Sequence, residues 1–348
     1  MPMASKAPLD APGAEARLRT FLQAHAPQLG ALRQAVKFSV GQSNPTYKLS
    51  MDAGDYVLRT QPLGELLKSA HAVDREHRVM KALGSGDVPV PPMILACEDL
   101  EVLGVKWFLM GLVRGQTLTD PKLPDHDRDM RRHIYEAQLD VLARLATTKP
   151  DELGLSDFGR PSGYLERQLH VWTRQYRASE TQPIPAMEEL ITQLPARLPQ
   201  DNNDVVVVHG DFRLDNLLID KRGEVQAVID WELSTLGPAL VDLSYWCTML
   251  RMDQNWPIAG LGGVDRSAIG IPSEDELISQ FASKTGIAIP DDWHVWIAFH
   301  CFRFAAILQG IAKRVQEGNA SADNAASVAT QARPMAELGA EILHAGGR

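Results

Sequence analysis

Cysteine and positive charge are both scarce in this chain of 348 residues. Its three cysteines, Cys97, Cys247 and Cys301, are scattered and form no Cys-x-x-Cys pair, so we expect neither disulfide bonds nor a zinc site. Acidic residues outnumber basic ones, 44 to 35, which gives a net charge of −9. We therefore expect no basic surface and no nucleic-acid partner.

Long hydrophobic runs are also missing. No segment approaches the roughly 20 apolar residues that span a bilayer, and the first 13 residues lack an apolar core of signal-peptide length. We therefore expect no membrane partner and a cytoplasmic protein, because a reducing compartment is the default for scattered thiols. The 45% hydrophobic content is enough for a large buried core, and the length suggests roughly two domains.

The most informative stretch lies between residues 205 and 230. Four valines end at a His-Gly-Asp motif whose acid is Asp211, Asn216 follows five residues later, and a further apolar run ends at Asp230. Phosphoryl transfer needs a carboxylate to orient an acceptor hydroxyl and hard oxygen ligands to hold Mg²⁺. Asp211 suits the hydroxyl, whereas Asn216 and Asp230 suit the metal.

A simpler interpretation is that both acids merely end strands, because Asp and Gly are common in turns. Either acid alone would favour that interpretation. The joint pattern does not, because two apolar runs each deliver an acid at the same end, with an amide between them. His209 is expected to be a scaffold residue that hydrogen-bonds the backbone.

These motifs resemble those of the aminoglycoside phosphotransferase and choline kinase branch of the protein-kinase-like fold. That branch has His-Gly-Asp where protein kinases have His-Arg-Asp, and Ile-Asp-Trp where they have Asp-Phe-Gly. The resemblance implies that Asp211 is the catalytic carboxylate, that Asn216 and Asp230 bind Mg²⁺, and that ATP is the phosphoryl donor. It also implies that Asp242, in a Val-Asp-Leu segment, is structural.

The resemblance further implies an α+β, bilobal protein-kinase-like fold. Residues 1–113 would form a small, mostly antiparallel nucleotide-binding lobe with an N-terminal helix. Residues 114–348 would form a larger, mainly helical catalytic and acceptor-binding lobe, with inserted helices at about 160–200. The residue patterns predict strands around 35–40, 46–51, 56–60, 94–98 and 105–110, and helices over 14–26, 72–83, 186–198 and 293–314, and from about 128 and 164 onward.

Four residues of the first lobe are candidates for contact with the nucleotide phosphates. Ser43 and Asn44 belong to a Gly-Gln-Ser-Asn turn whose amides could approach phosphates, although an ordinary hairpin turn has the same composition. Arg59 stands where related kinases have a phosphate-contacting Lys, and Glu76 stands where they have its acidic partner. A surface Arg and a surface Glu are the simpler alternative, but the catalytic segment favours the ion pair.

Gly111 and Val113, at the end of the first lobe, are the candidate residues for contact with the nucleotide base. By the resemblance, the backbone of Gly111 and Val113 hydrogen-bonds adenine, so side-chain identity matters little there. An ordinary linker between the lobes is an equally compatible interpretation of this segment.

Two further segments narrow the resemblance. Gly163–Gln168 with Trp172, and Phe302–Gly310, resemble the phosphotransferase-like domain fused ahead of acyl-CoA dehydrogenase in some long chains. Members of that subgroup are associated with phosphorylating 4-hydroxyacyl-CoA. Tyr164, Trp172 and Arg303 are therefore predicted to provide an apolar groove with a cation for an anionic group. Arg303 is unusual within an apolar helix and should face a carboxylate, a phosphate or a cavity.

The sequence thus predicts an ATP-dependent phosphotransferase that acts on a hydroxyl of a small metabolite, with a 4-hydroxyacyl-CoA as the preferred acceptor. An aminoglycoside kinase or another small-alcohol kinase is the first alternative, because a net acidic chain attracts polycations. A nucleotide-binding pseudokinase is an alternative of another class. It is supported by Arg59 at the usual Lys position and opposed by the intact Asp211, Asn216 and Asp230.

Overall fold

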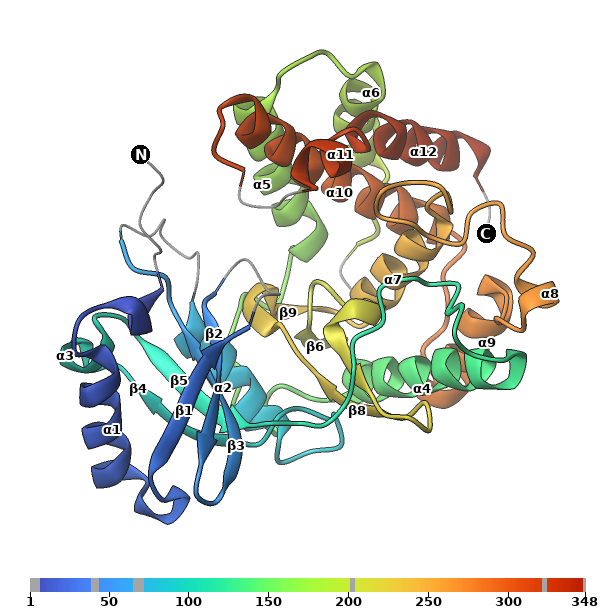
Figure 1. Cartoon of the computed structure of the whole chain (residues 1–348). Coiled ribbons are helices and arrows are strands. Elements are labelled where there is room, and N and C mark those ends of the chain that lie inside the picture. Colours follow the sequence, from blue (N-terminus) through green and yellow to red (C-terminus); the bar gives the residue numbers. More distant parts are fainter. Residues whose placement is uncertain (1–6, 39–43, 65–71, 201–203, 321–323, 347–348) are drawn as a thin grey trace. The chain divides into compact units, whose positions relative to one another are not determined.

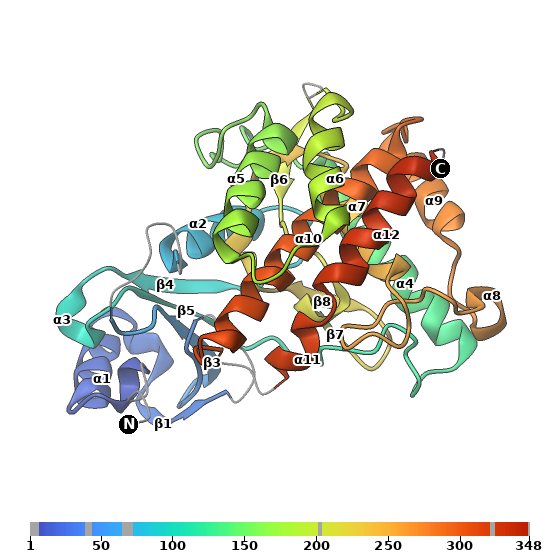
Figure 2. The same cartoon turned by 90° about the horizontal axis from the view of Figure 1, so that it is seen from above.

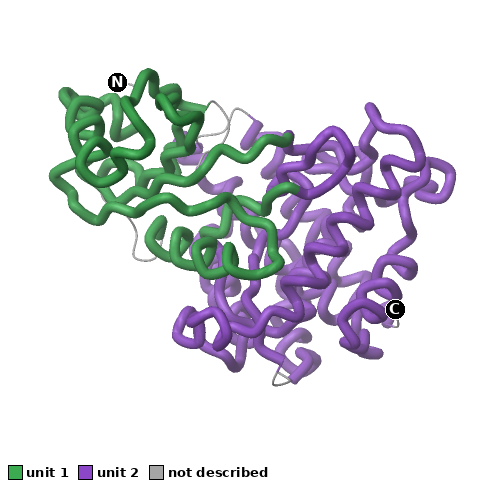
Figure 3. The backbone as a smooth tube through the Cα atoms, turned by 90° about the horizontal axis from the view of Figure 1, so that it is seen from below, with its two compact units in different colours: residues 1–115, 226–232 green, residues 116–225, 233–348 purple. Residues whose placement is uncertain are grey.

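The computed structural model describes residues 7–38, 44–64, 72–200, 204–320 and 324–346. The chain divides into two compact units, which Figure 3 colours separately. Unit 1 comprises Met1–Gly115 and Gln226–Glu232, and unit 2 comprises Gln116–Val225 and Leu233–Arg348. The short segment Gln226–Glu232 thus belongs to the N-terminal unit, although a long stretch of unit 2 separates the two parts in sequence.

Unit 1 is built on a five-stranded antiparallel sheet in the order β1-β2-β3-β5-β4 (Figure 1). Its strands are β1 (Leu32–Lys37), β2 (Thr46–Met51), β3 (Gly54–Thr60), β4 (Met93–Cys97) and β5 (Trp107–Gly111). The strand predicted at 35–40 begins earlier than expected, at Leu32. It follows closely on Gly30, whose φ of 73° lets the chain turn sharply after the preceding helix.

Helices flank both faces of this sheet. They are α1 (Ala14–His25), α2 (Val73–Leu83) and the short α3 (Leu100–Leu103). Leu18 of α1 shares a hydrophobic core with Leu58 of β3, whereas Glu76 of α2 pairs with Arg59 of the same strand. Since neighbouring side chains of a strand point to opposite faces, α1 and α2 lie on opposite faces of the sheet.

Unit 2 is mainly helical, with short strands beside the predicted catalytic segment. Its strands are β6 (Val205–Val208), β7 (Leu217–Ile219) and β9 (Thr235–Pro238), and β8 (Val225–Val228) leads from unit 2 into unit 1. β6 and β9 pair antiparallel. The helices are α4 (Arg128–Thr147), α5 (Tyr164–Ser179), α6 (Pro185–Gln193), α7 (Val241–Arg251), α8 (Arg266–Ile269), α9 (Glu274–Thr285), α10 (Trp293–Gln316), α11 (Ala325–Ala329) and α12 (Ala332–Ala345).

Local chemistry explains where two of these helices begin and end. The Asp127 carboxylate accepts a hydrogen bond from the Met130 N–H, so α4 begins at Arg128, as predicted. α6 ends at Gln193, earlier than the predicted helix over 186–198. Pro195, in a 3₁₀ turn that follows, has no N–H and cannot continue the α-helical hydrogen bonds.

α10 is the core helix of unit 2. It packs against α5, α6, α7, α11 and α12, and Figure 2 shows it between α5 and α12. Gly339 of α12 permits a close crossing, because a Cβ there would lie 2.7 Å from the Cβ of Cys301.

The expectation that no segment approaches the length of a membrane span was wrong. Among the described residues, α10 is the one helix that is long and apolar enough to cross a membrane by length and composition. Within unit 2, however, 78% of its most apolar stretch is buried, so its apolar residues pack against neighbouring helices.

Candidate active site

The predicted catalytic segment forms a loop at the end of β6 in unit 2. Gly210 has a φ of 84°, and a Cβ there would lie 2.9 Å from the Leu233 carbonyl oxygen, so the turn requires glycine. The Asp242 carboxylate accepts the N–H groups of His209 at 2.7 Å and of Gly210 at 2.9 Å. Burial raises the pKa of Asp242, and His209 and these N–H groups oppose the rise. This geometry agrees with a structural role for Asp242, which holds the loop.

The Asp211 carboxylate is held by two neutral donors. The Tyr245 hydroxyl donates to Oδ1 at 2.5 Å, and the Asn216 amide donates to Oδ2 at 3.0 Å and to the Asp211 carbonyl at 2.9 Å. The Asp211 N–H donates to Nδ1 of His209 at 3.1 Å, so His209 does bond the backbone, as expected of a scaffold residue. The Asp211 side chain is 28% exposed, which leaves it accessible to an acceptor.

The remaining charged groups of this loop form an ion pair. Arg213 pairs with Asp215, and its Nε lies 4.0 Å from Oδ1 of Asp211. Burial lowers the pKa of Arg213, but Asp211 and Asp215 outweigh this effect and raise it overall, so the guanidinium stays charged. Because the amide nitrogen of Asn216 is committed to Asp211, its Oδ1 is the atom suited to a cation.

The predicted nucleotide residues of unit 1 meet in a charged cluster around Arg59. Its Nε donates to Oε2 of Glu76 at 2.7 Å and its Nη2 donates to Oδ1 of Asp230 at 2.5 Å, while Oε2 of Glu232 lies 4.0 Å away. The expected Arg59–Glu76 ion pair is therefore present. The Asn44 amide donates to Glu232 at 3.1 Å, which brings the described end of the predicted phosphate turn to the same cluster.

Among the described residues, the Arg59 guanidinium faces three carboxylates, those of Glu76, Asp230 and Glu232. Burial raises the pKa of Glu76 to about 7; Arg59 opposes the rise, and Asp230 and Glu232 reinforce it. Burial also lowers the pKa of Arg59, but the three carboxylates outweigh this and raise it overall. Arg59 therefore keeps its charge, whereas Glu76 takes up a proton more readily, first because it is buried and then because the charges of Asp230 and Glu232 lie nearby.

Asp230 has an uncommon backbone conformation. Its φ is 67°, and among the described residues Leu123 is the one other non-glycine residue with a positive φ. The left-handed region is sterically unfavourable for residues with a Cβ and is tolerated where the surrounding structure enforces it, often at functional sites. This strain at the acid of the Ile-Asp-Trp motif is an independent reason to treat Asp230 as a functional residue.

The two residues predicted to contact adenine lie at the end of β5 and just beyond it. The Gly111 N–H donates to the Pro92 carbonyl at 2.8 Å, so this N–H is already committed to the protein. Within the described part of the chain, the Val113 N–H has no backbone acceptor. Ser43 lies outside the described residues.

The three predicted acceptor residues differ in their surroundings. Tyr164 is 2% exposed, and the missing Cβ of Gly237 makes room for its ring, which leaves little surface for an acceptor. Trp172 is partly exposed and lies 5.8 Å from the Arg303 guanidinium. Arg303 was expected to face a carboxylate, a phosphate or a cavity. Its Nη2 donates to the Gly210 carbonyl at 2.8 Å, and aromatic rings lie against the guanidinium. Its charge also opposes the rise that burial causes in the pKa of Asp242, so a carboxylate does lie near it.

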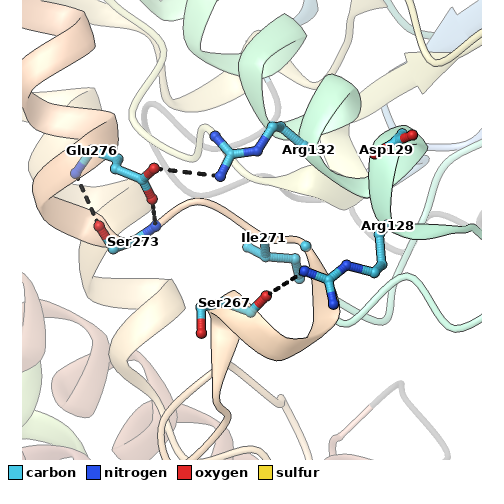
Figure 4. A pocket seen from close by; sticks show the side chains of 8 residues that line it. Arg128, Asp129, Arg132, Ser267, Ile271, Ser273 and Glu276 are labelled. Carbon is cyan, nitrogen blue, oxygen red and sulfur yellow. Dashed lines mark hydrogen bonds and ion pairs between the residues drawn. The ribbon is translucent and has the colours of Figure 1, made fainter.

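A separate concavity of unit 2 lies where α4 approaches α8 and α9 (Figure 4). It is lined by Arg128, Asp129, Arg132, Ser267, Gly270, Ile271, Ser273 and Glu276. Arg128 donates to the Ser267 and Ala268 carbonyls, and Arg132 lies 3.4 Å from the Glu276 carboxylate. Its cations already have protein partners, and none of the predicted site residues lies there.

Sequence reasoning missed Tyr245 and Glu232. Tyr245 follows Asp242 by three residues on α7, so the helical period brings both side chains to the side of the loop. That spacing was the available signal. Glu232 follows Asp230 by two residues in a Trp-Glu-Leu turn, where nothing local marks it as a partner of Arg59.

The fold and these motifs define a kinase-like phosphotransferase. The chain belongs to the phosphotransferase enzyme family, whose model matches residues 34–276. A solved structure of a putative aminoglycoside phosphotransferase from Ralstonia eutropha is 40% identical, with a TM-score of 0.87 over 96% of this chain and 99% of that one. A thermostable mutant of aminoglycoside phosphotransferase APH(4)-Ia, solved with ADP and hygromycin B, shares the fold at 15% identity, with a TM-score of 0.60 over 93% of this chain and 98% of that one.

Longer relatives bear out the predicted subgroup. Acyl-CoA dehydrogenase family member 10 of Mus musculus is 42% identical over 88% of this chain and 29% of its own length. Acyl-CoA dehydrogenase family member 11 of Homo sapiens is 38% identical over 93% of this chain and 42% of its own length. The chain thus spans less than half the length of these relatives and is homologous to their phosphotransferase region.

Proposed function

We propose that this protein transfers the γ-phosphoryl group of ATP to a hydroxyl group of a small metabolite. The observation that carries the proposal is the geometry of Asp211. Its two oxygens accept from Tyr245 and Asn216, which together orient the carboxylate, and Nε of Arg213 lies 4.0 Å from Oδ1. A fixed carboxylate of this kind can accept a hydrogen bond from an acceptor hydroxyl and aim its oxygen at a phosphorus atom.

The donor set fits Mg²⁺ bound with ATP. Asp230 and Asn216 supply carboxylate and amide oxygens, which are hard ligands. Mg²⁺ is commonly bound through one or two protein oxygens together with substrate phosphates. When bound, Mg²⁺ neutralises phosphate charge. Asp230 would then exchange Arg59 for the cation.

The nucleotide would be held mainly by residues of unit 1. Released from Asp230, the Arg59 guanidinium could donate to phosphate oxygens while Glu76 keeps it in place. The predicted turn of Ser43 and Asn44 would add backbone donors. The Gly111 carbonyl and the Val113 N–H would bond adenine.

For the acceptor, we propose a 4-hydroxyacyl-CoA. The names of the longer relatives associate this kind of domain with acyl-CoA chemistry. A groove between α5 and α10 also supports the proposal. It is lined by Trp172, Ile307 and Arg314, together with Lys313, which donates to the Ala178 carbonyl and pairs with Glu317. Such a groove suits an acyl chain that carries phosphate groups at its other end.

An aminoglycoside kinase is the second candidate, favoured by the name of the Ralstonia eutropha relative. The two candidates differ in what they need from the protein. A polyhydroxylated cation needs many polar partners when it loses water, whereas an acyl chain needs apolar surface. The apolar part of the α5–α10 groove therefore favours the thioester.

The test is ADP release measured with a panel of 4-hydroxyacyl-CoA thioesters, free hydroxy acids, choline and kanamycin. We expect turnover with a thioester that depends on Mg²⁺ and is lost in Asp211→Asn. Turnover with kanamycin and none with any thioester would reject the acceptor but keep the phosphotransferase. Nucleotide binding without turnover on any compound would indicate a pseudokinase.

A further inference from the structure

Tyr245 has a contact that separates it from the other buried tyrosines of unit 2. Its side chain is 3% exposed, and its hydroxyl donates to Oδ1 of Asp211 at 2.5 Å. Burial raises its pKa well above the ordinary value, with the charge of Asp211 adding to the rise, so the hydroxyl keeps its proton. The group is therefore a permanent donor to the carboxylate.

Arg303 holds both this tyrosine and the loop. It is 4% exposed, its guanidinium carbon lies 5.4 Å from the Tyr245 ring centroid, and its Nη2 donates to the Gly210 carbonyl. Its Nε and Nη1 have no hydrogen-bond partner among the described residues. Trp172 lies on the guanidinium at 5.8 Å. The charge of the buried Asp242 compensates this cation in part, since Arg303 opposes the rise that burial causes in the pKa of that carboxyl. Arg303 thus contacts the residue before Asp211 and the ring of the side chain that binds Asp211.

His300 packs against the same tyrosine. The two rings meet edge to face at 5.5 Å, and Nε2 of His300 lies 3.0 Å from the Ser244 hydroxyl. Burial, followed by the charge of Arg303, holds the pKa of His300 well below its ordinary value, so the imidazole is neutral. Tyr245 is thus packed between a neutral imidazole and a guanidinium, which restricts its ring.

We propose that Tyr245 is a positioning residue for phosphoryl transfer: its hydroxyl, held in place by Arg303, fixes the orientation of the Asp211 carboxylate. Asn216 fixes the second oxygen of the same carboxylate, so the two bonds together restrict its rotation. The acceptor hydroxyl can then donate its hydrogen bond to an Asp211 oxygen in one defined direction. The inference rests on the proposed role of Asp211.

Tyr245→Phe tests the inference, because it removes the hydroxyl and keeps the ring against Arg303. Tyr135→Phe is the matched control. Tyr135 is also buried in unit 2 and donates a short hydrogen bond, 2.6 Å, to the Pro121 carbonyl rather than to Asp211. ADP release is measured with a 4-hydroxyacyl-CoA and with water as the acceptor, together with the melting temperature of each variant.

We expect Tyr245→Phe to lower kcat about tenfold, as expected for losing one hydrogen bond to a charged group, with KM for ATP changed less than about twofold. More ATP should be hydrolysed per acceptor phosphorylated, since a misaligned carboxylate favours water. Tyr135→Phe should keep kcat within about twofold. Equal kcat losses in both variants would mean a structural role and overturn the inference.

The double variant separates this inference from the proposed function. If Tyr245 acts through Asp211, Tyr245→Phe has no further effect in an Asp211→Asn background. Multiplicative losses would overturn the inference. Full activity in Asp211→Asn would instead reject the proposed role of Asp211. An inactive Asp211→Asn beside a fully active Tyr245→Phe would reject the positioning role alone. Arg303→Lys, which lacks the planar fork, should reproduce the kcat loss without a change in KM for ATP.

Discussion

The two acids that frame the catalytic motifs are held in opposite ways. In unit 2, Asp211 accepts hydrogen bonds from a tyrosine hydroxyl and an amide, both neutral. In unit 1, Asp230 forms an ion pair with Arg59, and the same guanidinium also pairs with Glu76. The two hydrogen bonds to Asp211 orient its carboxylate, and the Arg213 guanidinium lies farther away, with Nε 4.0 Å from Oδ1. A shared cation cancels charge and can be exchanged for another cation. This difference in partners agrees with the proposal that Asp211 aims a hydroxyl and Asp230 binds a metal.

The backbone around the two acids differs as well. In unit 2, Gly210 takes the left-handed conformation, and Asp211 follows it without strain. In unit 1, Asp230 itself takes this conformation, at a cost on the order of 1–3 kcal/mol. The acid that contacts the cation is thus the strained one, and its ion pair with Arg59 offsets part of that cost.

Replacing Asp211 and Asp230 should cause the largest changes in kcat and in nucleotide affinity. Asp211→Asn keeps the shape but loses the charge, so kcat should fall by about 10²-fold or more, while Mg·ATP affinity stays nearly unchanged. Steady-state kinetics and nucleotide titration with and without Mg²⁺ measure both quantities. Asp230→Asn should weaken Mg²⁺-dependent nucleotide binding in addition to lowering kcat.

The contrast between these variants is the critical result. Equal losses of nucleotide affinity in Asp211→Asn and Asp230→Asn would reject the division of labour. Loss of affinity in Asp211→Asn alone would reverse the two roles.

Arg59 gives the next largest expected effect. Arg59→Ala should raise KM for ATP about tenfold or more and lower kcat, because a charge-assisted contact to phosphate is lost. Glu76→Ala should act in the same direction but less. Arg59→Lys need not restore activity, since an ammonium lacks the planar fork that here reaches two carboxylates.

Arg33→Ala is the matched control for Arg59→Ala. Arg33 also belongs to the sheet of unit 1 and pairs with Asp52 at 2.6 Å, but its side chain is 68% exposed. It should leave KM for ATP unchanged. Unchanged kinetics in both variants would mean that Arg59 is a structural cation.

The smallest expected effect is the pH dependence of stability caused by Glu76. Its folded-state pKa of about 7 lies above the ordinary 4.5. Its contribution to the free energy of unfolding is therefore fully present below about pH 4.5 and is lost as the pH rises through about 7. Glu76→Gln has no proton to lose, so its Tm relative to the wild type should rise by about 2–4 °C between pH 5 and pH 8.

Glu15→Gln, which alters an exposed pair with Arg19 in unit 1, is the control for this measurement. Its Tm difference from the wild type should stay constant over the same pH range. A constant difference for Glu76→Gln as well would contradict the raised pKa of Glu76.

Local patterns predicted much of this molecule. The apolar period of α4 and the alternation in β2 follow from which faces are buried, so the sequence located these elements closely. Asp211 and Asn216 lie five residues apart in one loop, and their contact follows from that short connection. The predicted end of a helix was wrong where a single residue decided it. The helix predicted to reach residue 198 ends at Gln193, because Pro195 follows.

By itself, the sequence determined the family and the fold and pointed to Asp211 and Asp230 as candidate site residues, because motif spacing along one chain carries that information. The tertiary structure alone decided what each acid touches. Asp230 reaches Arg59 across 171 residues of chain, and Tyr245 reaches Asp211 from a helix packed behind the loop. It also decided that Arg303 faces a carbonyl and two rings. The physical reason is that a hydrophobic period shows that a face is buried but not which partner buries it.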